Sequence, residues 1–150
     1  IFSTPESPFE VGKAYVLREG KDVTILSTGI ETPYALKAAE ALAKGGVDAE
    51  VVHVPTVKPL DTKTILESVK KTGRAVSCED AQAAGGFGGA IAELLCDEMP
   101  APLLRIGIDD RYGESGAPLE VHKNLGLADD SIAKRTKAFV KKVPSYKPGF

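Results

Sequence analysis

The sequence predicts a three-layer α/β sandwich built on a five-stranded mixed sheet whose first strand is antiparallel to the rest. Short apolar runs alternate along the chain with segments of helical periodicity, an order typical of parallel sheets covered by helices on both faces. The turn at 19–22 (EGKD) is too short for a helical crossover, so the first strand cannot be a parallel neighbour of the second. The expected strands are Lys13–Arg18, Val23–Ser27, Glu50–Val54, Arg74–Cys78 and Leu103–Ile108.

Helix signals lie in the intervals between these strands. Thr32–Pro33 is typical of a helix start with proline at the first helical position, and Gly45–Gly46 ends that helix. Asp61 is placed to cap a second helix. Asp129 or Asp130 is expected to cap the final helix.

The stretch Cys78–Leu95 combines a strand end, two acids and a glycine-rich turn. The helix that follows, Phe87–Met99, places its apolar residues on one face. Ligands or partners usually lie beyond the carboxyl ends of the strands in such sheets. Neither the Rossmann fingerprint nor the P-loop pattern fits, because Ile91 stands at the sixth position counted from Gly86 and no Gly-Lys-Ser/Thr follows. The glycines therefore indicate close approach of the backbone to a ligand, another subunit or a neighbouring helix.

Composition restricts the function classes. The 150 residues make one ordinary domain, and the net charge of −2 with no basic run argues against nucleic acid as a partner. No apolar run reaches transmembrane length and no signal peptide is visible, which argues against a membrane partner. Cys78 and Cys96 each lie in an apolar pattern, so we expect buried free thiols in a reducing, cytoplasmic compartment.

The chemistry-bearing side chains do not form a recognisable active site. His53 and His122 are expected to be structural, and no zinc-binding spacing is present in the sequence. Ser115 is interpreted as a turn or cap residue, since a nucleophile elbow needs a strand directly before the serine. Glu79 and Asp80 could form an acid–base pair, but we expect them to cap the glycine turn or to pair with an arginine. The sequence thus predicts a well-built domain without a self-contained catalytic centre.

Five short segments in this order resemble the C-terminal domain of transketolases, in the thiamine-diphosphate enzyme superfamily. Each alone is a weak signal, whereas five in the right order are a strong one, and the resemblance extends roughly from Pro8 to Val143. The segments are Phe9–Ala14 (FEVGKA), Val23–Gly29 (VTILSTG), Val54–Asp61 (VPTVKPLD), Glu79–Asp80 with Gly85–Gly88 (GGFG), and Ser115–Gly116 with Glu120 and Leu125–Leu127 (LGL).

The resemblance implies the same fold and a specific chemistry for the whole enzyme. A transketolase moves a two-carbon ketol unit from a ketose phosphate to an aldose phosphate, using thiamine diphosphate and a divalent metal, magnesium or calcium. In the family the cofactor lies between the other two domains, across a homodimer interface. The resemblance therefore implies a cytoplasmic transferase of the pentose phosphate pathway whose C-terminal domain holds no cofactor, metal or catalytic residue and contacts the cofactor-binding domains.

The sequence also predicts domain boundaries, and it leaves alternative functions open. Residues 1–8 are expected to link to a preceding domain, 9–143 to form the C-terminal domain, and 144–150 to form a tail. Sister enzymes end in the same domain type, namely 1-deoxy-xylulose-5-phosphate synthases and the beta subunits of 2-oxo-acid dehydrogenases. A ligand-binding regulatory module and a dimer-stabilising interaction domain are further hypotheses. The candidate interface or ligand turn comprises Glu79, Asp80, Gly85, Gly86, Phe87, Gly88, Gly89, Ser115 and Gly116.

Overall fold

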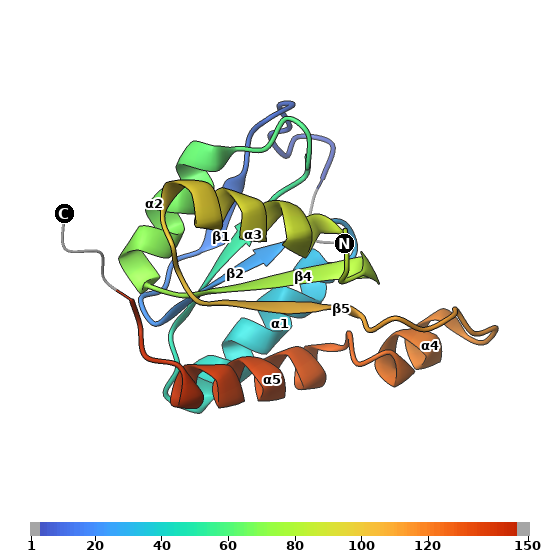
Figure 1. The fold of residues 1–150 in the computed structure, drawn as a ribbon. Helices are drawn as coiled ribbons and strands as arrows, with labels where there is room; N and C mark the ends of the chain where they lie inside the picture. The colour runs from blue at the N-terminus through green and yellow to red at the C-terminus, as the bar shows by residue number, and fades with distance from the viewer. Residues whose placement is uncertain (1–3, 147–150) are drawn as a thin grey trace.

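The computed structural model describes residues 4–146, so the predictions for residues 1–3 and 147–150 lie outside the described range. The chain alternates strands and helices around one central sheet (Figure 1). The elements are β1 (Tyr15–Arg18), β2 (Val23–Ser27), α1 (Glu31–Lys44), β3 (Ala49–His53), α2 (Thr62–Thr72), β4 (Ala75–Gln82), α3 (Phe87–Glu98), β5 (Leu103–Ile108), α4 (Pro118–Asn124) and α5 (Asp129–Lys142).

The sheet has the predicted mixed topology. Its strand order is β1-β3-β2-β4-β5. β1 runs antiparallel to β3, with Tyr15 opposite His53, and the other three pairs are parallel. The prediction of a five-stranded mixed sheet with an antiparallel first strand is therefore confirmed. The tight turn after β1 does not make β1 and β2 neighbours, because β3 lies between them.

Two helices cover each face of the sheet. In Figure 1, α2 and α3 lie above the sheet and α1 and α5 lie below it. The expected small-residue face of α1 is buried against the sheet, with Ala35, Ala38 and Ala39 fully inaccessible to water. On the other face, Ile91 of α3 packs in a cluster with Ile65 of α2. This burial of apolar side chains on both faces is the main source of stability in such a fold.

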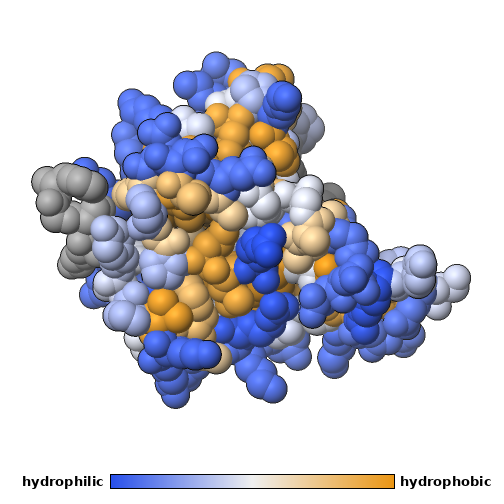
Figure 2. Space-filling view, viewed as in Figure 1, coloured by the Kyte–Doolittle hydropathy of each residue, from blue (hydrophilic) through white to orange (hydrophobic). Residues whose placement is uncertain are grey.

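The edge strand β5 is covered less completely than the central strands. Apolar side chains remain visible around it, between hydrophilic ones, in the space-filling view (Figure 2). Leu103 and Leu104 are accordingly half-buried, whereas every residue of β2 is buried. None of the helices in the described part of the chain has the length and apolar character needed to cross a bilayer.

A buried polar cluster fastens α2 to the sheet. Glu50 of β3 is 1% exposed, accepts a hydrogen bond from the Ser68 hydroxyl and faces the ammonium group of Lys71. The Thr24 hydroxyl lies 2.8 Å from the hydroxyls of both Ser68 and Thr72. A buried carboxylate is tolerated here because a cation and hydrogen-bond donors surround it.

Two of the predicted helix starts are wrong in detail. The helix α1 begins at Glu31, so Pro33 stands at the third rather than the first helical position. Proline is tolerated there because the first-turn N–H groups have no partner within the helix. The cap of α5 is Ala128, so neither Asp129 nor Asp130 caps it, and both lie in its first turn. Asp61 does cap α2, accepting a hydrogen bond from the Thr64 amide at 3.1 Å.

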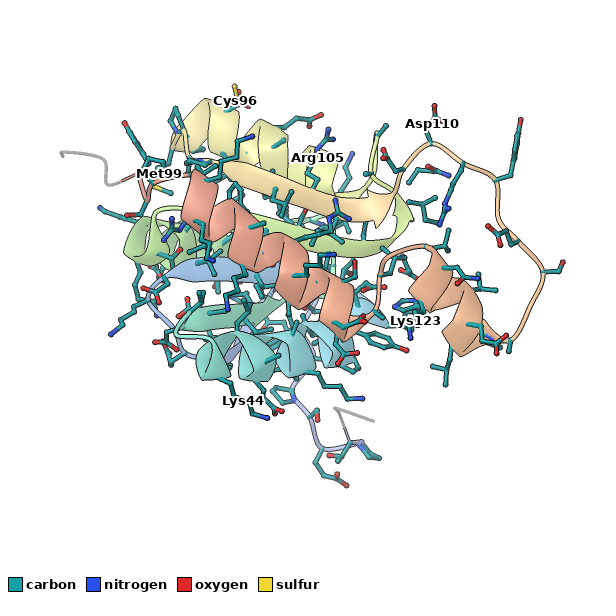
Figure 3. The ribbon with its side chains drawn as sticks, turned by 90° about the horizontal axis from the view of Figure 1, so that it is seen from below. Lys44, Cys96, Met99, Arg105, Asp110 and Lys123 are labelled. Atoms are coloured by element: carbon teal, nitrogen blue, oxygen red, sulfur yellow. The ribbon has the colours of Figure 1, made fainter. Side chains whose placement is uncertain are left out.

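Two further predictions fail near the glycine-rich turn. The strand β4 does not end before the acids but continues to Gln82, which pairs with Ile108 of β5. Cys96 is exposed, although Cys78 is buried as predicted. The apolar neighbours of Cys96 suggested burial, but its position on α3 turns it away from the sheet (Figure 3).

Candidate functional site

The first acid of the predicted turn, Glu79, caps helix α3. Its carboxylate accepts hydrogen bonds from the amides of Phe87, at 2.6 Å, and Gly88, at 2.8 Å. Glu79 is only 1% exposed. A carboxylate at this place satisfies two amides that the helix leaves unpaired and lies at the positive end of the helix dipole. The predicted capping of the glycine turn is therefore what the geometry shows for Glu79.

Two glycines of the turn are required because the backbone there lies close to the side chains of Glu79 and Ser77. A Cβ at Gly86 would stand 2.0 Å from Oε2 of Glu79, and a Cβ at Gly88 would stand 2.5 Å from Oγ of Ser77. Any larger residue at either place would displace the cap or the strand beneath it. The backbone thus approaches the protein's own side chains at these two glycines.

The remaining glycines of the turn face open space. A Cβ at Gly85 or Gly89 would meet no atom within 4 Å. Both border a shallow hollow of about 420 Å³ that Val57 and Glu93 also line. An anion in this hollow would not find the Phe87 and Gly88 amides free, because Glu79 already occupies them.

Asp80 does not share a site with Glu79. Successive residues of a strand point to opposite faces of the sheet, and Asp80 is exposed where Glu79 is buried. A Cβ placed on Gly29 would lie 3.8 Å from Oδ1 of Asp80, so this carboxylate stands beside the loop after β2. The two adjacent acids therefore do not form an acid–base pair.

Ser115 and Gly116 lie on the long loop between β5 and α4. Every residue from Asp109 to Glu120 is exposed, and the part that carries Asp110 arches away from the sheet (Figure 3). Ser115 does not cap α4, whose cap is Ala117. Within residues 4–146 no side-chain hydrogen bond joins Ser115 to the glycine turn. The loop is instead held to β4 by the Gln82 side-chain amide, which donates to the carbonyl of Arg111 at 2.9 Å.

A buried cluster that the sequence did not predict lies at the carboxyl end of β2. Glu31, the first residue of α1, is fully buried, and its Oε1 lies 3.1 Å from Nε2 of His122 on α4. The His122 ring is stacked on Tyr34, with 4.3 Å between ring centroids. Burial, together with the nearby charge of Asp80, raises the pKa of the Glu31 carboxyl to about 8. His122 is thus structural, as expected, but its acidic partner was not foreseen.

His53 also takes a structural position, at the end of β3. Its Nδ1 lies 2.8 Å from the hydroxyl of Thr32 on α1, so it links the strand to the helix. Partial burial lowers the pKa of the imidazole, which favours the neutral ring.

An apolar groove lies at the end of the sheet where β2 and β3 terminate. Three large apolar side chains at its rim are mainly exposed: Phe9 at 68%, Ile30 at 57% and Leu119 at 73%. Pro33 and Tyr34 line the groove, whose volume is about 680 Å³. Exposed apolar side chains gathered around a groove are typical of surfaces that contact a partner.

Within the described residues, the glycine turn does not fit thiamine diphosphate or its metal. No group of three or more histidine, cysteine, aspartate or glutamate side chains within the described range is placed to hold a metal ion. The helix N-terminus that could receive a diphosphate has its first amides occupied by Glu79.

Comparison with known proteins places this geometry in context. Residues 12–132 match the family model described as transketolase, C-terminal domain. The chain is 48% identical over 126 residues to the 6-deoxy-6-sulfo-D-fructose transketolase subunit SqwH of Clostridium sp. (strain MSTE9), covering 84% of this chain and 39% of that protein. It is 40% identical over 131 residues to a 1-deoxy-D-xylulose-5-phosphate synthase of Thermomicrobium roseum, covering 87% of this chain and 21% of that protein.

A solved structure is similar over nearly the whole chain. A split gene transketolase, described as an inactive beta4 tetramer, superposes with a TM-score of 0.89 at 37% identity. The match covers 94% of this chain and 46% of the other. The chain thus spans less than half the length of these similar proteins.

Proposed function

The chain belongs to the transketolase C-terminal domain family. We therefore propose that it forms the C-terminal domain of a thiamine-diphosphate-dependent transketolase and contributes to the assembly of that enzyme. The apolar groove at the C-terminal ends of β2 and β3 is the observation that carries this proposal. In the proposed enzyme the groove receives a neighbouring domain or subunit. The catalytic groups come from the cofactor-binding domains.

The glycine turn is a second contact surface in this proposal. Gly85 and Gly89 have open space beside them, and Val57, which lines the same hollow, is 42% exposed. The exposed loop with Ser115 and Gly116 offers backbone that a partner chain can approach. Glu79 supports this surface from inside, because it holds the first turn of α3 in place.

Ketol transfer between sugar phosphates is the reaction we propose for the whole enzyme. The relative from Clostridium is named as a transketolase subunit, and the similar solved structure is a split gene transketolase. We further propose a homodimer of the complete enzyme, a divalent metal with the cofactor, and a place in the pentose phosphate pathway of the cytoplasm. Synthesis of 1-deoxy-xylulose 5-phosphate is the alternative, favoured by the 40% identity to such a synthase.

A product assay on the complete parent protein tests the reaction. The parent is incubated with xylulose 5-phosphate, ribose 5-phosphate, thiamine diphosphate and magnesium. Formation of sedoheptulose 7-phosphate is expected. If none forms and pyruvate with glyceraldehyde 3-phosphate yields 1-deoxy-xylulose 5-phosphate instead, the proposal is overturned in favour of the synthase.

A charge placed in the groove tests the assembly role. Ile30→Glu puts a carboxylate on an exposed rim position, so it disturbs association more than folding. Tyr146→Glu is the matched control, because Tyr146 is 45% exposed and its amide bonds to Gly73 at the opposite end of the sheet. Light scattering of the parent is expected to show dissociation for Ile30→Glu alone; equal association of both variants would contradict the proposal.

A further inference from the structure

Helix α4 is attached to the rest of the domain through very few side chains. It follows the exposed loop from Asp109 to Ala117, and His122 is its one buried residue. Figure 3 shows α4, which carries Lys123, beyond the ends of α1 and α5. Beyond the helix, Leu127 enters the core at 1% exposure. The position of α4 is therefore set by Leu125 and Leu127 after its C-terminal end, by the contacts of His122, and by the Arg111 guanidinium, which donates to the carbonyl of Asn124 at 2.6 Å.

The acid that His122 meets has no strong partner of its own. Both carboxylate oxygens of Glu31 are buried, and among the described residues neither has a hydrogen bond of regular geometry. The groups that face Glu31 are Asp80 and the Cys78 thiol from β4 and the His122 imidazole from α4. Arg135 of α5 acts on the same thiol. A buried carboxylate in such surroundings is stabilised by keeping its proton.

A protonated Glu31 carboxyl can donate to Nε2 of His122, which lies 3.1 Å from Oε1. This contact joins α1 to α4, whereas Oε2 of Glu31 has no hydrogen-bond partner among the described residues. Loss of that proton leaves an ionised carboxylate out of water with Asp80 as a neighbouring charge.

The position of α4 also shapes the apolar groove. Leu119, on the first turn of α4, lines the groove together with Ile30 and Tyr34 of the α1 end. Tyr34 carries the His122 ring on its face. If α4 separates from α1, the groove loses one wall.

We propose that the Glu31–His122 contact is a proton-dependent latch that holds α4 on the domain and so completes the groove. The latch itself rests on the geometry of this chain, and its effect on assembly rests on the function proposed above. Closing the latch buries the carboxyl, and opening it returns the carboxyl to water.

The sign of the pH dependence follows from burial. The pKa of Glu31 is raised in the closed state, to about 8, and returns toward the ordinary range for an exposed acid in the open state. The closed state therefore binds the proton more tightly, and its stability falls as the pH rises toward 8. Below about pH 8 each pH unit changes the open-to-closed ratio about tenfold, and above about pH 8 the ratio levels off because Glu31 ionises in both states. We therefore expect the ratio to rise about thirtyfold between about pH 6.5 and about pH 9.5.

Hydrogen exchange of the 150-residue chain tests the latch. Protection factors, which remove the intrinsic pH dependence of exchange, are measured for the α4 amides of Val121 and Leu125, both bonded within the helix region. They are expected to fall with rising pH in the wild-type chain. Glu31→Gln cannot ionise and is expected to remove the fall, whereas the matched control Glu120→Gln, an exposed acid of α4, keeps it.

Protection that does not change with pH in the wild-type chain overturns the latch, whatever the variants do. So does an equal fall in Glu31→Gln. Light scattering of the parent at neutral and alkaline pH then tests the link to assembly. If the latch opens and the parent stays associated while Ile30→Glu dissociates it, the regulatory link fails and the assembly function stands. If Ile30→Glu has no effect, the assembly function fails and the latch stands.

Discussion

Removal of the Glu79 carboxylate is expected to destabilise the domain substantially. Glu79→Ala leaves the buried amides of Phe87 and Gly88 without the acceptor that now lies 2.6 and 2.8 Å away. Loss of a helix cap costs about 1–2 kcal/mol, and an unsatisfied buried amide costs about 1–3 kcal/mol. Because these terms overlap, we expect about 3 kcal/mol, or a fall in Tm of about 6–12 °C for a domain of this size.

Glu79→Gln separates hydrogen bonding from charge. The glutamine keeps one carbonyl acceptor for one amide, but its NH₂ group faces the other donor. We expect a loss of about 1–2 kcal/mol, between alanine and wild type. Glu93→Ala on α3 is the control, because this carboxylate is exposed and its loss is expected to change stability by less than about 0.5 kcal/mol.

Urea denaturation of the four chains, followed by far-ultraviolet circular dichroism, measures these differences. The predicted order of unfolding free energy is wild type and Glu93→Ala, then Glu79→Gln, then Glu79→Ala. A Glu79→Ala chain as stable as the control would refute the reasoning, because the two amides would then not depend on this carboxylate.

Two further predictions concern neighbouring residues. Gly86→Ala is expected to destabilise the domain by more than about 2 kcal/mol, because its Cβ would lie 2.0 Å from the Glu79 carboxylate. Gly89→Ala lies within α3 with open space beside it, so it should be neutral or stabilise the domain by up to about 1 kcal/mol. Denaturation midpoints distinguish the two variants, and equal values would contradict the close contact at Gly86. A thiol reagent such as dithionitrobenzoate is expected to modify exposed Cys96 quickly and Cys78 only on unfolding, because burial raises the pKa of the Cys78 thiol; a fast phase that survives Cys96→Ser would show that Cys78 is accessible.

The layers of the fold could be predicted because they depend on local patterns. Apolar runs, helix stops at Gly45–Gly46 and the cap at Asp61 are all read within a few residues. The tight turn after the first strand excluded a parallel pairing with the second. The insertion of β3 between β1 and β2 could not be predicted, because it depends on pairing between residues 33 to 38 positions apart.

The roles at the candidate site were harder to predict, because they also depend on contacts between residues far apart in the sequence. Glu79 and Asp80 look equivalent in the sequence, and strand alternation separates them only once β4 is known to extend to Gln82. The contact of Glu31 with His122 joins two residues 91 positions apart that no short motif connects. Cys96 was misplaced because it follows buried Leu95 by one residue, and successive residues of a helix lie about 100° apart, so Cys96 takes a different face.

The most direct test of the central proposal measures association and ketol transfer on the same samples of the complete parent carrying Ile30→Glu. Light scattering gives the associated fraction at each protein concentration, and the product assay gives the rate. If this domain acts through assembly, the rate per associated enzyme equals that of the wild type at every concentration. A parent that associates normally but turns over more slowly would show that this domain contributes directly to catalysis, which would contradict a role in assembly alone.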